Sequence, residues 1–162
     1  MSTPPVGTGG TNTGPGFEGC SALCVSSTHL VVSGLKSGEL FSNAFEACRN
    51  GECYRGAFDA ASSSNTIALT GGTGDETTVW LFYEAPPKLT LHLNWALQVG
   101  TTGFVDGDHY TLRTIEPAGF ASTLIDTLVT YEPRTICGSE CSTAYVPDLQ
   151  RPIEAAGGAA SE

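Results

Sequence analysis

The sequence predicts an all-β fold, an antiparallel β-sandwich of about seven to eight strands that is held together by disulfide bonds. Three observations favour this fold. Residues 88–98 alternate between apolar and polar side chains, as a half-buried strand does. Further short segments are separated by turn-forming Gly, Pro and Asn residues. The 6 cysteines fall in closely spaced pairs, which is typical of exported domains.

The strongest single strand prediction covers residues 88–98, KLTLHLNWALQ. Side chains of a strand point alternately to its two faces, so every second residue shares a face. The apolar face comprises Leu89, Leu91, Leu93, Trp95 and Leu97, and the polar face comprises Thr90, His92, Asn94 and Gln98. We therefore expect this strand to bury one face in the core and to leave the other in contact with water.

The other strands are predicted, in chain order, at residues 29–36, 43–48, 52–59, 66–70, 77–84, 109–115 and 123–131. Turn signals separate these segments, and Asn50-Gly51 is the strongest of them. No segment carries the apolar spacing and the end caps of a helix. At most, residues 20–24 or 139–143 form a single helical turn.

The segment TTVWLFYE, residues 77–84, is apolar on both faces. A strand of this kind is usually central and buried between two layers, so we expect Trp80 and Phe82 to belong to the core. The alternative is that exposed rings form a carbohydrate-binding platform. The candidate rings for such a platform are Trp80, Phe82, Tyr83, Trp95, Phe104, Tyr110, Phe120 and Tyr131.

Composition divides the chain into three parts. The N-terminal segment MSTPPVGTGGTNTGPG consists almost entirely of Gly, Pro, Thr and Ser, and cannot bury enough apolar surface to offset the entropy lost on ordering. The C-terminal segment ends EAAGGAASE and has the same character. We expect a flexible tether over residues 1–19, one folded domain over residues 20–147 and a disordered tail over residues 148–162.

The middle pair of cysteines is the one whose bonding can be argued from geometry. A two-residue type I′ turn at Asn50-Gly51 places Cys48 opposite Cys53 on a hairpin. Cα atoms at that non-hydrogen-bonded position lie about 4.5 Å apart, within the range of about 4.4–6.8 Å that a disulfide needs. The sequence therefore predicts a Cys48–Cys53 bond.

The outer cysteines, Cys20, Cys24, Cys137 and Cys141, allow two arrangements. Each of the two pairs can close locally, and this is the arrangement that we predict. The alternative is a cross-link between the two segments, which joins the start of the folded domain to its last strand. Zinc binding is less favoured because no histidine lies near any pair, and a redox C-x-x-C motif is absent.

Charge and cysteine content together indicate the compartment. The chain has 7 Lys and Arg against 17 Asp and Glu, a formal net charge of −10, which excludes nucleic acid and anionic membranes as partners. No apolar run approaches the roughly 20 residues of a transmembrane segment. We expect a secreted, periplasmic or cell-surface protein whose signal peptide has been removed. If Met1 is the native start, a reduced cytosolic protein is the alternative.

Few residues suggest a reactive site. Asp106 and Asp108, in FVDGDHY, are candidate calcium ligands, although an Asp-Gly turn that leads into a strand explains them more simply. No other cofactor is expected. His29, His92 and His109 have no nucleophile motif such as G-x-S-x-G to serve, so no catalytic residue is predicted and the protein is expected not to be an enzyme.

Three stretches carry a family resemblance: FEACRNGECYRGAF, DGDHYTLRTIEPAG with Tyr110 at its aromatic position, and STLIDTLVTY. They resemble strands of the immunoglobulin-like and transthyretin-like sandwiches found in carboxypeptidase regulatory-like domains and bacterial surface proteins. The Gly/Thr-rich tether also resembles that of mature bacterial lipoproteins. The chain departs from antibody domains because it lacks their buried inter-sheet cysteine pair, and its CGSEC segment has no counterpart. The resemblance implies a domain that binds, spaces or displays.

We therefore predict a non-enzymatic extracytoplasmic module for display, adhesion or binding, whose ligand is a protein or a carbohydrate. One alternative is a ligand-binding module that depends on carbohydrate or calcium. Another is the structural subunit of an extracellular assembly, which self-associates through exposed sheet edges. A hydrolase with its site on the loops is the least favoured alternative.

Overall fold

The computed structural model describes residues 24–41, 43–72, 77–85, 89–97, 103–115 and 122–152. These residues form a β-rich fold with two disulfides between described cysteines, so the prediction of an all-β, disulfide-bonded protein is confirmed. The elements are β1 (Ser27–Ser33), α1 (Ser37–Phe41), β2 (Ala44–Arg49), β3 (Glu52–Ala57), β4 (Thr66–Gly71), β5 (Thr77–Glu84), β6 (Thr90–Leu97), β7 (Asp108–Thr114), β8 (Ser122–Val129), β9 (Glu132–Ile136) and β10 (Ser139–Leu149).

All of these strands belong to one 10-stranded sheet, in the order β8-β7-β2-β3-β4-β5-β6-β1-β10-β9. Every described neighbour pair is antiparallel except β1 and β10, which run parallel. The prediction of an antiparallel sandwich of seven to eight strands is therefore wrong. The physical reason is the short β3–β4 ladder, in which Tyr54 pairs with Gly71 and Arg55 with Thr70, because it joins the two halves of the sheet.

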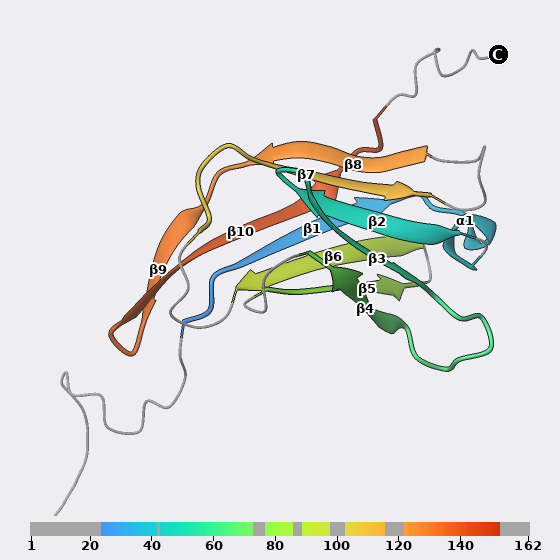
Figure 1. Cartoon of the computed structure of the whole chain (residues 1–162), viewed down its shortest axis with the longest axis horizontal. Helices are drawn as coiled ribbons and strands as arrows, with labels where there is room; N and C mark the ends of the chain where they lie inside the picture. The colour runs from blue at the N-terminus through green and yellow to red at the C-terminus, as the bar shows by residue number, and fades with distance from the viewer. Residues whose placement is uncertain are drawn as a thin grey trace, which may run out of the picture.

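The sheet curls so that its two halves face each other across the core. In Figure 1, β8, β7 and β2 lie on one side of the molecule, whereas β4, β5 and β6 lie on the other. Trp95 of β6 packs edge-on against Tyr54 of β3 and Tyr110 of β7, with ring centroids 5.2 and 5.5 Å apart. These rings come from opposite halves of the sheet, so closing the curl buries them together.

The prediction that alternate residues of β6 form one buried apolar face is confirmed. Leu91, Leu93, Trp95 and Leu97 are buried. The prediction for β5 is only half right, because Val79 and Leu81 enter the core while Trp80 and Phe82 are half-buried on the opposite side of the sheet. Because the sheet curls, its opposite half covers only one face of β5, and the other face is directed toward solvent.

The C-terminal strands were not predicted from the sequence. β10 runs beside β1 through Leu149, so residues 139–143 are extended and do not form the helical turn that the sequence allowed at most, and the strand continues past residue 147. Leu149 packs against the core, and Arg151 forms an ion pair with Glu39 at 2.8 Å. The tail beyond residue 152 lies outside the described residues, as does the predicted tether at residues 1–19.

The helix α1 is a single turn between β1 and β2. The Glu39 carboxylate accepts a hydrogen bond from the backbone N–H of Lys36 at 2.9 Å, which caps the start of the turn. Leu40 is buried and anchors the turn to the core. Within the described residues, no helix has the length and apolar character needed to cross a membrane.

The Cys48–Cys53 disulfide is confirmed. Cys48 and Cys53 are paired in the β2–β3 register with Cα atoms 4.0 Å apart. The connecting turn has positive φ at both central positions, 51° at Asn50 and 90° at Gly51, as a type I′ turn requires. Local sequence information was therefore sufficient to define this bond.

The predicted local pairing of the outer cysteines is wrong, and the alternative cross-link is the one observed. Cys24 is bonded to Cys141, across a sequence separation of 117, with Cα atoms 5.4 Å apart. The parallel register pairs Ser27 with Thr143, so the segment that precedes β1 lies beside the first residues of β10, which include Cys141. Cys137 is also disulfide-bonded, whereas Cys20 lies outside the described residues. A thiolate zinc site on the described cysteines is excluded, because each of them is disulfide-bonded.

Tryptic peptides of the unreduced protein distinguish the two outer arrangements. Cleavage after Lys36 and Arg134 leaves Cys20 and Cys24 on one peptide, and Cys137 and Cys141 on another. We expect mass spectrometry to find these two peptides covalently linked until a reductant is added, with Cys20 bonded to Cys137 by elimination. Two unlinked peptides would show local pairing instead.

The two described disulfides are expected to differ in their effect on stability. In the chain-entropy account, closing the long loop through Cys24–Cys141 contributes about 5 kcal/mol, and closing the short hairpin through Cys48–Cys53 contributes about 2 kcal/mol. Because the expected Cys20–Cys137 bond closes nearly the same long loop, both bonds must be removed to open it. Urea unfolding should therefore show a larger loss for the quadruple variant C20S/C24S/C137S/C141S than for the control C48S/C53S. Equal losses, or a larger loss for the hairpin pair, would contradict this expectation.

Candidate functional site

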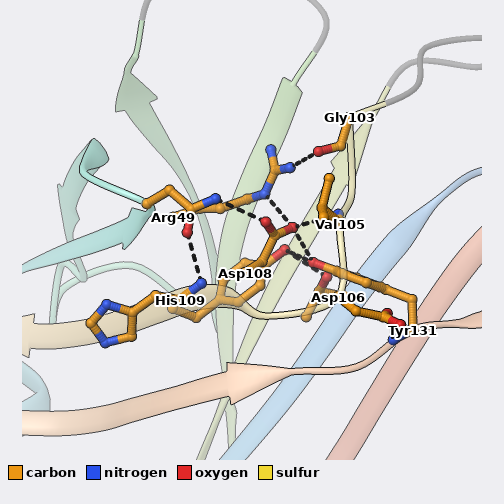
Figure 2. Close-up of polar contacts among 10 residues, drawn as sticks. Arg49, Gly103, Val105, Asp106, Asp108, His109 and Tyr131 are labelled. Atoms are coloured by element: carbon orange, nitrogen blue, oxygen red, sulfur yellow. Dashed lines mark hydrogen bonds and ion pairs between the residues drawn. The ribbon is translucent and has the colours of Figure 1, made fainter.

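The carboxylate of Asp108, at the start of β7, accepts hydrogen bonds from four different residues (Figure 2). Its side chain is only 4% exposed. Oδ1 accepts a hydrogen bond from Asn50 Nδ2 at 2.8 Å. Oδ2 accepts from Arg49 Nε at 3.0 Å, from the N–H of Val105 at 3.1 Å and from the hydroxyl of Tyr131 at 2.8 Å. Four donors therefore compensate for removing this charge from water.

Asn50 and Arg49 also tie the β2–β3 turn to β7 and to the loop at residues 103–107. The backbone N–H of Asn50 donates to the carbonyl of His109, and the Asn50 side-chain oxygen accepts from the N–H of His109, both at 2.8 Å. Arg49 also donates to the carbonyl of Gly103, and its guanidinium lies over the Phe104 ring at 4.7 Å. Figure 2 shows Arg49 bridging these two segments.

A chain of hydroxyl groups leads from Asp108 across the core. Because the Tyr131 hydroxyl donates to Asp108, it must accept from the hydroxyl of Tyr110, 2.7 Å away. Tyr110 then accepts from Thr28 on β1, at 2.8 Å. Burial raises the pKa of Tyr131 and of Tyr110, so both hydroxyls remain protonated. The chain connects the two facing halves of the sheet.

The structure brings the two predicted calcium ligands into this network. Asp106 accepts a hydrogen bond from the N–H of Tyr131 at 2.8 Å, and Asp108 is ion-paired with Arg49. Calcium at Asp108 would have to compete with a guanidinium and with three other donors. Calcium binding by Asp106 and Asp108 stays a hypothesis, and their observed contacts hold the loop against β7.

A second group of residues lies on the side of the sheet that faces away from the core. We call Trp80, Phe82, His92, His29 and Tyr145 the outer aromatic face. The register places Tyr145 of β10 beside His29 of β1, His29 beside Asn94 of β6, and Asn94 beside Trp80 of β5. Phe82 stands next to His92 in the adjacent row, and their rings stack with centroids 4.1 Å apart.

Histidine side chains connect the centre of this face. Nε2 of His29 lies 2.8 Å from Nδ1 of His92, and Nε2 of His92 lies 2.9 Å from a carboxylate oxygen of Glu84. The Tyr145 ring lies against His29 with centroids 4.9 Å apart. Burial, followed by the neighbouring His92, lowers the pKa of His29, so this imidazole is neutral at pH 7.

Two further hollows lie elsewhere on the described surface. One cavity of about 410 Å³ lies between the Cys24–Cys141 bond, Phe104 and the β9–β10 hairpin, and includes Arg134 and Glu140. A groove of about the same volume, 410 Å³, crosses β3, β2, β7 and β8 over the Cys48–Cys53 bond. Its ionisable side chains are already paired, because Glu46 binds Arg55 and Arg113, and His109 binds Asp126.

The Asp108 network is expected to control acid stability. Burial opposes ionisation of Asp108, but hydrogen bonds from Asn50, Tyr131, Val105 and Arg49 outweigh it and hold its pKa below the usual value. A depressed pKa contributes stability above the unfolded value of about 3.9, and this contribution is lost as the pH falls through the folded pKa.

We therefore expect Asp108→Asn to lower the free energy of unfolding by about 3 kcal/mol at pH 7, because it leaves Arg49 without its counter-ion. The loss of stability below about pH 4 should also be shallower in this variant than in the wild type. Asp126→Asn is the matched control, because its carboxylate is 53% exposed. Urea unfolding at several pH values measures both effects, and equal pH profiles for Asp108→Asn and the wild type would contradict the assignment.

Sequence reasoning placed Asp106 and Asp108 at a site but missed Arg49 and Tyr131, which complete it. It also missed the pairing of His29 with His92, whose only local signal is a histidine in an alternating strand. No protein-family model, curated protein or solved structure matches the chain. The arrangement of its own side chains therefore carries the functional interpretation.

Proposed function

We propose that the protein is a non-enzymatic, extracytoplasmic binding module and that its outer aromatic face binds a neutral glycan. One observation carries this proposal: the rings of Trp80, Phe82 and Tyr145 stand on the outer side of the sheet and not in the core. Tyr145 is 63% exposed, although a ring of this size would bury much apolar surface in a protein interior.

The chemistry of this face suits a sugar. A pyranose ring has an apolar face of C–H groups, which stacks on aromatic rings, and a rim of hydroxyl groups, which needs hydrogen-bonding partners. The outer aromatic face offers both, because the imidazole of His29 and the carboxylate of Glu84 lie among the rings. A purely apolar ligand would leave these polar groups without partners.

The dimensions of the face suit a short chain of sugars. Tyr145 and Trp80 lie in one row across four neighbouring strands, β10, β1, β6 and β5. Three strand spacings separate them by about 14 Å. A row of this length can contact several linked sugar rings, with Tyr145 and Trp80 as the two stacking positions.

Charge favours a neutral ligand. The formal net charge of −10 repels acidic polysaccharides as it repels nucleic acid. The disulfides are compatible with an extracellular location, where such glycans occur. The resemblance to immunoglobulin-like and transthyretin-like binding domains stays a prediction, and it agrees with a role in binding or display.

The proposal is tested by titrating soluble neutral polysaccharides (glucan, mannan and xylan) into the protein and following tryptophan fluorescence and heat. We expect at least one of them to bind and to change the emission of Trp80. Polygalacturonate, which is anionic, should not bind. Tyr145→Ala should weaken binding about tenfold, because one stacking ring is lost.

Leu128→Ala is the matched control for Tyr145→Ala, because Leu128 is 69% exposed on β8, away from the outer aromatic face. It should bind like the wild type. If none of the neutral polysaccharides binds, or if both variants bind like the wild type, the glycan proposal fails. A protein ligand captured through Tyr145 would identify the same face as a protein-binding surface instead.

A further inference from the structure

We propose that His29 and His92 form a binding site for a divalent transition-metal ion, with Cu²⁺ as the preferred ion. The site lies within the outer aromatic face but does not rest on the glycan proposal, since its ligands are imidazole nitrogens. The observation behind it is the 2.8 Å approach of His29 Nε2 to His92 Nδ1, from two different strands. Two imidazole nitrogens this close can bind one ion together once the hydrogen bond between them opens and the rings turn toward the ion.

The hydrogen bond to Glu84 places a proton on one nitrogen of His92. Glu84 is a carboxylate, so the His92 Nε2 at 2.9 Å from it must carry the proton. With His92 neutral, its lone pair is on Nδ1, and the proton of this contact is carried by His29 Nε2. For His29 to bind a metal through Nε2, this proton leaves to solvent and Nδ1 takes up another. The neutral imidazole changes tautomer with no net gain or loss of protons.

The separation of the two nitrogens favours a particular coordination geometry. With metal–nitrogen bonds of about 2.0 Å, two ligands at right angles lie about 2.8 Å apart, and two at the tetrahedral angle lie about 3.3 Å apart. The observed 2.8 Å is closer to the right angle, which is typical of tetragonal Cu²⁺ and Ni²⁺ sites. The general order of affinity for nitrogen ligands also has Cu²⁺ first.

The surroundings of the pair supply the outer contacts that metal-binding histidines usually have. Glu84 holds the remaining nitrogen of His92, as the carboxylate partner of a ligating histidine does, and it adds negative charge beside the ion. His92 is 9% exposed and is stacked on Phe82, which limits the rotation of its ring. Tyr145 covers His29. The positions of the ion that the two histidines do not fill are left for water or a bound ligand.

Other clusters of ligand atoms among the described residues are weaker candidates. Glu46 lies close to Cys48 and Cys53, but both sulfur atoms belong to a disulfide and offer no thiolate. The third histidine, His109, is paired with Asp126, and both side chains are about half exposed. His109 therefore serves as the internal control for the proposed pair.

The test uses the full chain with its disulfides intact, titrated separately with CuCl₂, NiCl₂, ZnCl₂ and CaCl₂ in a calorimeter at pH 7.5. We expect one Cu²⁺ ion per chain, weaker binding of Ni²⁺ and Zn²⁺, and no binding of Ca²⁺ at this site. The electron paramagnetic resonance spectrum of the Cu²⁺ complex should show an axial signal with coupling to two nitrogen atoms.

Three variants test the site: one removes a proposed ligand, one removes the carboxylate partner of the other ligand, and one is a control. His29→Asn should abolish one-to-one Cu²⁺ binding, and Glu84→Gln should weaken it about tenfold by removing the carboxylate partner of His92. Glu84 is 64% exposed, so its substitution leaves the fold intact. His109→Asn should bind like the wild type. The proposal is overturned if the wild-type spectrum lacks coupling to two nitrogen atoms, if one-to-one binding survives His29→Asn, or if it is lost in His109→Asn.

Discussion

The buried carboxylate of Asp108 is the interaction on which the rest of the fold depends. A charge in this position is tolerated only with donors on every side, and those donors come from the β2–β3 turn, the loop at residues 103–107 and the segment after β8. The hydrogen bonds to this one side chain therefore hold together three segments that are distant in sequence. Through Tyr131 and Tyr110 the same network reaches Thr28 on β1, where the two halves of the curled sheet meet.

Local patterns predicted the strands, but not how they pair. The period of β6 and the Asn50-Gly51 turn are properties of a few adjacent residues, so the β6 core face and the Cys48–Cys53 bond could be derived from the sequence. The parallel pairing of β1 with β10 and the Cys24–Cys141 bond depend on contacts between residues more than a hundred positions apart. β9 was missed because all of its residues are exposed, so it lacks an apolar face.

The candidate sites show the same division. The acidic turn at Asp106 and Asp108 was visible in the sequence, whereas Arg49 and Tyr131, which determine its chemistry, were not. Trp80 and Phe82 were assigned to the core because an apolar run does not reveal which face a second layer covers. His29 and His92 are 63 positions apart, and only the β1–β6 register brings them together.

The Cys24–Cys141 bond also has a mechanical consequence. When the two ends of the chain are pulled apart, tension passes from Cys24 through the sulfur atoms directly to Cys141 and on along β10. The covalent loop between the two cysteines, with its separation of 117 positions, lies outside this load path. β10 is already extended, so tension cannot lengthen it appreciably. The residues inside the covalent loop, which include the polar network and every member of the outer aromatic face except Tyr145, would keep their arrangement under a force that unfolds an uncrosslinked domain.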